Sequence, residues 1–306
     1  MAYLFSGSEV VGNLGLPVNR RMIVVEKLAE QFAEEGYAIW ERAFEPEEAE
    51  RMRAEADSIL ELIINSTIAH GRKSGRLDIL ETEAGQLVRK IQPINDLSLY
   101  LARVSEDARL LDPLRTIMGD EPVLMEEKLN YKEPLPEKVP GIDCGGRVDD
   151  RFPIHSDWAY YKAQDYPQTI VSSAIAFDDC SPDTGPLHIW PGSHREDLPH
   201  ERNHLGLEVI PGHIDPEGGI DVLAPAGSVM FFHSLLVHNS RPNVSGRPRR
   251  LMIYSHYPEA ADMGHDVRNG PRRLEESPFE WEYQRMRQSG IFEDVFSAPV
   301  FEQSAA

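Results

Sequence analysis

Residues 122–257 consist of short apolar runs separated by Pro, Gly, Asp and Asn, and this pattern constrains the fold more than any other feature. Runs bounded by turn-forming residues are typical of β-strands. Because no long helix is expected between one run and the next, parallel βαβ units are disfavoured and a jelly roll or β-sandwich is expected. The six clearest runs are 123–131, 169–177, 187–190, 207–210, 228–232 and 251–257.

The N-terminal third has a different pattern and predicts helices. Apolar residues between Ala49 and Ile63 recur mainly at spacings of three and four, which places them on one helical stripe. Further helices are expected over 23–32 and about 97–118, with Pro113 starting a new helix and Gly119 ending it. Helices followed by strands are compatible with two domains, but we favour helices packed on the outside of one barrel.

Charge and cysteine content limit the classes of partner. The chain has 31 Lys and Arg against 51 Asp and Glu, a formal charge of −20, which argues against nucleic acid and anionic membranes but not against a small anionic ligand. Two cysteines, Cys144 and Cys180, are too few for a disulfide framework or a thiolate zinc site. No signal peptide or membrane span is evident, so a cytoplasmic protein is expected.

A histidine and an aspartate in PIHSDW are the first candidate metal ligands. His155 and Asp157 are separated by one residue, and on a strand such side chains share a face. The pair is also compatible with a surface turn. A histidine from a distant segment, His233 or His238, would complete two imidazoles and one carboxylate. That set leaves metal positions open and is the usual site of non-haem Fe(II) oxygenases, whereas structural zinc is closed by four protein ligands.

Four motifs occur in an order that resembles the phytanoyl-CoA dioxygenase family of Fe(II)- and 2-oxoglutarate-dependent oxygenases. They are HSD at 155–157, TGPLHIWPGSH at 184–194, the phrase ending in His238, and Arg249 eleven residues further on. The phrases LNYKEP and HSDW are also similar to the ectoine-hydroxylase branch of the family. The resemblance covers about residues 122–257, and it rests on the occurrence of all four motifs in this order.

The resemblance implies a mainly β fold with flanking helices around a double-stranded β-helix, the cupin-like jelly roll. We expect one domain over 1–306, with N-terminal helices at about 20–120, the β core at about 121–258 and a C-terminal extension at 259–306. The N-terminal helical region, the long Pro- and Gly-rich loop at 133–151 and the C-terminal extension are expected to form the walls of the substrate pocket.

The resemblance also implies roles for individual residues. His155, Asp157 and His238 would bind Fe(II), which makes His233 either a core histidine or one that supports the metal ligands. Arg249 would bind the distal carboxylate of 2-oxoglutarate, for which the planar guanidinium is suited. Arg250 should point to the opposite face of its strand.

Weaker assignments follow from the same resemblance. Lys132 and Asn130 share a strand face and are expected to contact 2-oxoglutarate, as is Ser240, two residues after His238. The alternatives are a solvent-facing strand and an ordinary turn serine. Trp158 and Tyr160 are expected to form part of the substrate pocket, although ordinary core packing is the alternative for at least one of them.

The activity implied is that of a 2-oxoglutarate-dependent dioxygenase of the EC 1.14.11 type. With O₂ as the second co-substrate, it would hydroxylate an unactivated C–H bond of a small metabolite or natural-product intermediate and release succinate and CO₂. Asp157 fills the position that related halogenases leave small, which favours hydroxylation over halogenation. Desaturation, epoxidation and ring closure use the same ligands. A divalent-metal hydrolase or isomerase and a non-catalytic barrel are the remaining alternatives. The sequence specifies neither the substrate nor the oligomeric state.

Overall fold

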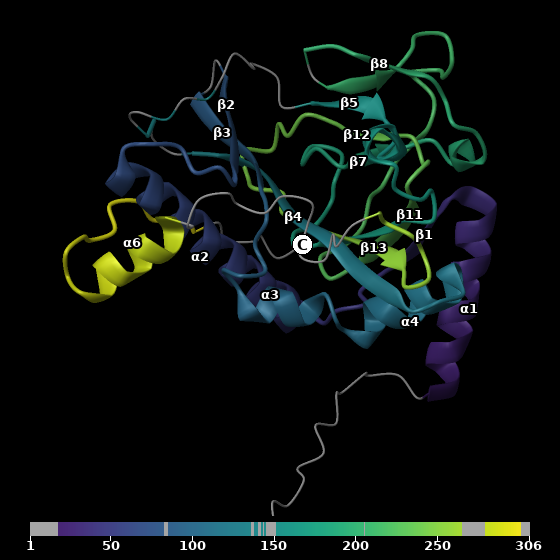
Figure 1. Cartoon of the computed structure of the whole chain (residues 1–306), viewed down its shortest axis with the longest axis horizontal. Helices are drawn as coiled ribbons and strands as arrows, with labels where there is room; N and C mark the ends of the chain where they lie inside the picture. Colours follow the sequence, from purple (N-terminus) through teal and green to yellow (C-terminus); the bar gives the residue numbers. More distant parts are fainter. Residues whose placement is uncertain are drawn as a thin grey trace, which may run out of the picture.

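Two antiparallel sheets form the centre of the molecule in the computed structural model (Figure 1), which describes residues 18–82, 85–135, 138–139, 142, 144, 151–204, 206–264 and 279–300. The larger sheet has the strand order β1-β11-β6-β13-β4-β3-β2, and the smaller one has the order β10-β7-β12-β5. The larger sheet comprises β1 (Tyr37–Trp40), β2 (Leu77–Thr82), β3 (Gly85–Ile91), β4 (Pro122–Pro134), β6 (Val171–Ala176), β11 (Val229–His233) and β13 (Leu251–Pro258). The smaller comprises β5 (Phe152–His155), β7 (Leu187–Ile189), β10 (Ile220–Asp221) and β12 (His238–Ser240), and a separate hairpin comprises β8 (His200–Arg202) and β9 (Leu207–Val209).

Side-chain alternation along the central strands separates two apolar cores. On β13, Met252 and Tyr254 belong to the core shared with the helices, whereas Leu251 and Ile253 belong to the core that includes Ile189 of the smaller sheet. Strand β11 shows the same division between its odd and even positions. Because successive side chains of a strand point to opposite faces, the larger sheet is covered on both sides.

Four helices contribute to the core on the outer side of the larger sheet (Figure 1). Helix α2 is the longest: Pro46 occupies its first turn, Glu45 and Glu48 form a capping box, and Gly71 ends it in the left-handed conformation. The helices are α1 (Val18–Glu35), α2 (Pro46–His70), α3 (Leu99–Val104) and α4 (Ala108–Met118), followed later in the chain by α5 (Trp158–Tyr161) and α6 (Phe279–Gln288) and the 3₁₀ turns η1 (Lys162–Gln164) and η2 (Ser193–Arg195).

The fold confirms the strand predictions and corrects two points in the N-terminal third. Each of the six predicted runs contains a strand. Residues 20–120, predicted to be helical, also supply β1, β2 and β3 to the larger sheet. Pro113 lies inside α4, because the helix starts at Ala108, where the carboxylate of Asp107 accepts the N–H of Arg109 as an N-cap. Gly119 ends the helix as predicted.

Two predicted pocket segments are described only in part. Most of the 133–151 loop lies outside the described residues, as do 265–278 and 301–306 of the C-terminal extension. The described part of the extension contains α6, which packs beside α2. Among the described helices, none is long and apolar enough to cross a membrane.

Candidate active site

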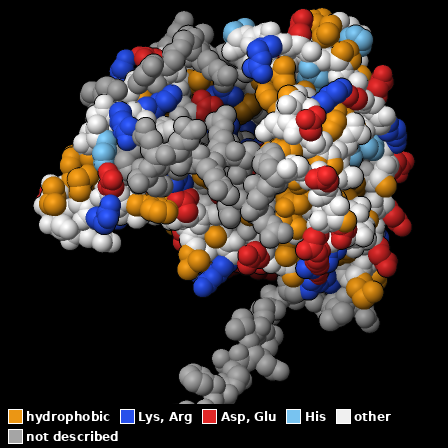
Figure 2. Space-filling model, viewed as in Figure 1, with side chains coloured by type: hydrophobic (Ala, Val, Ile, Leu, Met, Phe, Trp, Pro, Cys, Tyr) orange, Lys and Arg blue, Asp and Glu red, His pale blue; other side chains and the backbone are white. Residues whose placement is uncertain are grey.

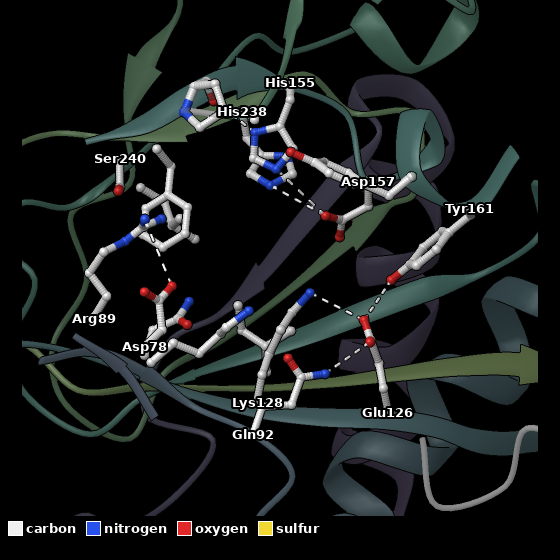
Figure 3. A pocket seen from close by; sticks show the side chains of 18 of the residues that line it. Asp78, Arg89, Gln92, Glu126, Lys128, His155, Asp157, Tyr161, His238 and Ser240 are labelled. Carbon is white, nitrogen blue, oxygen red and sulfur yellow. Dashed lines mark hydrogen bonds and ion pairs between the residues drawn. The ribbon is translucent and has the colours of Figure 1, made fainter. Parts of the chain in front are cut away.

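Two histidines meet because their strands pair. His155 is the last residue of β5 and His238 the first of β12, and the two stand directly opposite each other in the smaller sheet. Their ring centroids are 4.5 Å apart, and their Nε2 atoms lie 3.8 and 3.9 Å from Oδ1 of Asp157. All three side chains are buried and offer atoms within 4.8 Å of one another (Figure 3). This is the geometry of a shared cation site with two nitrogen ligands and one oxygen ligand.

The position of Asp157 has a different cause from the one predicted. Strand β5 ends at His155, and Asp157 has helical backbone angles of φ −59° and ψ −31° at the start of α5. The turn is fixed by the N–H of Trp158, which donates to the carbonyl of Ser234 at 2.8 Å. Asp157 therefore reaches the histidines through a strand-to-helix turn, and the argument from strand alternation was wrong.

Backbone carbonyls orient both imidazoles. Nδ1 of His155 lies 2.7 Å from the carbonyl of Pro153, and Nδ1 of His238 lies 2.9 Å from the carbonyl of Leu236. A carbonyl only accepts, so each Nδ1 is the protonated nitrogen and each Nε2 keeps a lone pair facing Asp157. Backbone contacts of this kind fix the tautomer and ring direction of metal-binding histidines.

Electrostatics keep His155 and Asp157 in the protonation states that a cation requires. Burial, followed by the neighbouring His238, lowers the pKa of His155 to about 3, so its imidazole is neutral. Burial opposes ionisation of Asp157, but Lys128 and then the two histidines lower its pKa below the usual value. A metal binds neutral imidazole and ionised carboxylate, so His155 and Asp157 need no deprotonation step at neutral pH.

The donor set fits Fe(II). Within the described part of the chain, Oδ2 of Asp157 is buried without a hydrogen-bond partner. A buried carboxylate oxygen without a partner is costly unless something binds it. Two imidazole nitrogens and one carboxylate form the facial set that holds non-haem Fe(II) and leaves its other positions open.

The alternative ligand His233 lies elsewhere. Its Nδ1 accepts the N–H of Leu235 at 3.0 Å, and its ring packs 5.8 Å from that of His194. Burial lowers its pKa to about 4, which is consistent with a neutral core histidine. The third member of the cluster is therefore His238.

A cavity of about 740 Å³ opens beside the three groups, and Figure 2 shows the hollow with acidic and basic side chains at its edge. The predicted residues Asn130, Tyr160, Ser240 and Arg249 line it. Arg249 is 2% exposed, and its Nη2 donates to the carbonyl of Gly185 at 2.7 Å, so its guanidinium is held in one direction.

The strand alternation predicted for the two neighbouring arginines is confirmed by their partners. Arg250 forms hydrogen bonds and ion pairs with Asp178 and Asp57 and is not a cavity residue. These two adjacent residues, which immediately precede β13, thus have different surroundings, the cavity for Arg249 and the two aspartates for Arg250.

Two other predictions are corrected by local geometry. Strand β4 has a bulge opposite β3, since Lys90 pairs with Asn130 but Val88 pairs with Glu133. Lys132 lies in this bulge at φ 44°, so it does not share a face with Asn130. Its Nζ donates to the carbonyl of Arg241, and it is not among the described cavity residues. Trp158 is likewise not in the cavity lining but packs in a separate apolar cluster.

The N-terminal region contributes to the cavity wall as predicted, but it does so through strands β2 and β3, next to β4, and not through helices. Glu126 is the centre of this wall: it accepts from Lys128 at 3.2 Å, from Gln92 at 3.2 Å and from the hydroxyl of Tyr161 at 2.9 Å (Figure 3). The polar residues Glu126, Lys128 and Asn130 alternate along the predicted strand 123–131. That alternation was the available signal, but the partner strands β2 and β3 lay in a region read as helical.

A jelly roll with two histidines and a carboxylate beside its main cavity defines the class of non-haem Fe(II) oxygenases. The sequence model of the phytanoyl-CoA dioxygenase (PhyH) family matches residues 32–251, so the chain belongs to that family.

Individual relatives agree with this assignment. The ectoine dioxygenase of Halomonas elongata is 28% identical over 236 residues, which is 71% of this chain and 65% of that relative. The structure of EctD from S. alaskensis with 2-oxoglutarate and 5-hydroxyectoine has a TM-score of 0.57 at 22% identity, covering 89% of each chain. The epimerase SnoN in complex with Fe³⁺, alpha-ketoglutarate and nogalamycin RO has a TM-score of 0.60 at 18% identity, covering 84% of this chain and 93% of SnoN.

The structural likenesses confirm the predicted jelly-roll fold. Family membership confirms the predicted class, a dioxygenase that depends on Fe(II) and 2-oxoglutarate.

Proposed function

We propose that this dioxygenase holds Fe(II) with His155, Asp157 and His238, binds 2-oxoglutarate with Arg249, and hydroxylates a C–H bond of a small molecule in the cavity. The cluster of two histidines and one aspartate carries the proposal, because its geometry and protonation states suit one divalent cation. When bound, Fe(II) would supply the redox chemistry by which O₂ oxidises 2-oxoglutarate and the target C–H bond.

The protein's own residues position the reactants. The carbonyls of Pro153 and Leu236 hold the two imidazoles, so their Nε2 atoms need no rearrangement to bind a cation. Arg249 is buried beside the same cavity, where a guanidinium can bind a carboxylate through two parallel hydrogen bonds. Tyr160 packs edge-on against His155 at 5.7 Å and helps to exclude water from the cluster.

Asn130 and Ser240 also line the cavity, and we assign them to co-substrate binding, with Tyr160 facing the substrate. The role predicted for Lys132 in 2-oxoglutarate binding remains a prediction; its Nζ donates to the carbonyl of Arg241, and Lys132 is not among the described cavity residues.

A small-molecule substrate is supported by the names of the relatives, which include ectoine dioxygenases and an L-proline trans-4-hydroxylase of Streptomyces griseoviridis. One domain is supported by a core that includes residues of α1, α2, α4 and the larger sheet. The free cysteines Cys144 and Cys180 are consistent with a cytoplasmic location. The absence of nucleic-acid partners rests on the charge of −20 alone.

The test is turnover under ¹⁸O₂ with Fe(II), 2-oxoglutarate and a panel of small metabolites. We expect succinate with one labelled oxygen, and a product that gains the other labelled oxygen if the reaction is hydroxylation. Desaturation would instead remove two hydrogens and leave the product unlabelled. The control is Asp157→Ala, which removes the carboxylate ligand. Succinate formation no faster in the wild type than in this variant, across the panel, would refute the proposal.

A further inference from the structure

The cavity has an excess of positive charge in a strongly acidic protein. Its described lining contains six Lys or Arg side chains and three carboxylates, although the chain as a whole carries a charge of −20. Two of these charged residues are already assigned: Arg249 to binding 2-oxoglutarate and Asp157 to binding Fe(II). Arg76 is paired with Asp96 through two hydrogen bonds of 2.6 and 2.7 Å. The remaining cationic residues are Arg89, Lys90, Lys128 and Arg202, opposed by Asp78 and Glu126.

Two lysines concentrate this charge next to the proposed iron site. Lys90 on β3 pairs with Asn130 on β4, and Lys128 is two residues from Asn130, so both lysines share one face. Diagonal neighbours of this kind are roughly 7–8 Å apart, a gap that a carboxylate or sulfate between two ammonium groups spans. Both lysines line the same cavity as the cluster of His155, Asp157 and His238, so an anion bound to them lies in the cavity of the iron site.

The two lysines differ in their acidic partners, because Lys128 forms an ion pair with Glu126 at 3.2 Å and Lys90 has no ion pair with the described residues. Glu126 binds Lys128, Gln92 and Tyr161, so its one negative charge is shared among three donors. Lys128 has three N–H donors and uses one of them on Glu126. Lys90 makes no ion pair or hydrogen bond with any residue that the structure describes, although Asp78 stands opposite it on β2.

An anionic ligand would therefore stabilise the charged form of Lys90. Burial and then the charge of Lys128 lower its pKa to about 8, so its charged form lacks a counterion of its own. A buried charge is stabilised when an opposite charge binds it.

From this geometry we propose that the substrate is an anion, and that its carboxylate, sulfonate or phosphate group binds between Lys90 and Lys128. The inference rests on the proposed function, because it assigns the substrate class of the same cavity. An anion at this point would hold the rest of the substrate against the cluster of His155, Asp157 and His238.

The test uses the anaerobic complex of the full chain with Fe(II) and saturating 2-oxoglutarate, titrated by calorimetry with sulfate, phosphate and acetate separately. We expect the wild type to bind at least one of these anions, and the strongest will indicate which acid the substrate carries. Lys90→Met and Lys128→Met should each weaken binding about tenfold or more, the loss expected for one charge-assisted hydrogen bond. Lys90→Arg should retain binding. The control Lys27→Met, on exposed α1, should match the wild type.

Each outcome separates this inference from the function on which it rests. The charge-transfer band of 2-oxoglutarate on iron reports both folding and the proposed function in every variant. A band without anion binding, or anion binding that both methionine variants retain, would overturn the inference alone. Absence of the band in the folded wild type would overturn the proposed function, whereas loss of the band only in the lysine variants would assign these lysines to 2-oxoglutarate and reject the substrate subsite.

Discussion

Replacing Arg249 by methionine should abolish most of the affinity for 2-oxoglutarate. The side chain is 2% exposed and faces the cavity that contains the iron site, so the carboxylate it binds is largely shielded from water. Truncating one partner of such a charge pair costs about 2–5 kcal/mol. At about 1.4 kcal/mol for each factor of ten, the dissociation constant should rise roughly 30- to 5,000-fold.

A graded variant separates charge from geometry. Arg249→Lys keeps the positive charge but loses the planar fork, and with it one of two hydrogen bonds. The loss of one charge-assisted bond is about 1.5–3 kcal/mol, so this variant should lie between the wild type and Arg249→Met. Arg247→Met is the matched control, because Arg247 is exposed on the same loop.

The assay is an anaerobic titration of the Fe(II)-loaded protein with 2-oxoglutarate, followed through the metal-to-ligand charge-transfer band. Thermal melts check that each variant is folded, since Arg249 also donates to the carbonyl of Gly185. An affinity within threefold of the wild type in folded Arg249→Met would refute the assignment.

Two further predictions concern the stability of the sheet. Arg250→Met should lower the free energy of unfolding by about 3–5 kcal/mol, because it leaves the buried carboxylate of Asp178 without its cation. Urea unfolding measures this loss of stability, and a loss below about 1 kcal/mol would contradict the prediction. Burial raises the pKa of Glu133 to about 8 from 4.5, so the folded protein keeps a proton that the unfolded chain releases, and stability should fall as pH rises from about 4.5 to 8. Glu133→Gln should remove this pH-dependent contribution to stability. The difference in unfolding free energy between the variant and the wild type should therefore change with pH. A difference that stays constant with pH would contradict the prediction.

The β core could be predicted from sequence because its strands are short apolar runs between turn residues. Leu251 to Tyr257 is one such run, and it became the central strand β13. The hairpin of β2 and β3 could not be recognised in the same way. It contains charged residues such as Asp78 and Lys90, which point into a polar cavity instead of an apolar core, and a bulge interrupts its alternation.

The candidate site was predictable in its residues but not in its local geometry. His155, Asp157 and His238 come together as expected, yet Asp157 does so from a helical turn that the sequence pattern does not reveal. Lys132 has a left-handed backbone, which is uncommon for lysine and therefore hard to foresee. Trp158 follows the turn into a separate apolar cluster and so misses the cavity.

The most direct test of the central claim is an anaerobic titration of the wild type and Asp157→Ala with Fe(II), with 2-oxoglutarate added at each step. The account predicts one Fe(II) per wild-type chain, a charge-transfer band that saturates at that ratio, and loss of tight binding and of the band in the variant. A folded wild type that forms no band, or a variant that binds Fe(II) as tightly as the wild type, would contradict the assignment of His155, Asp157 and His238 as the iron ligands.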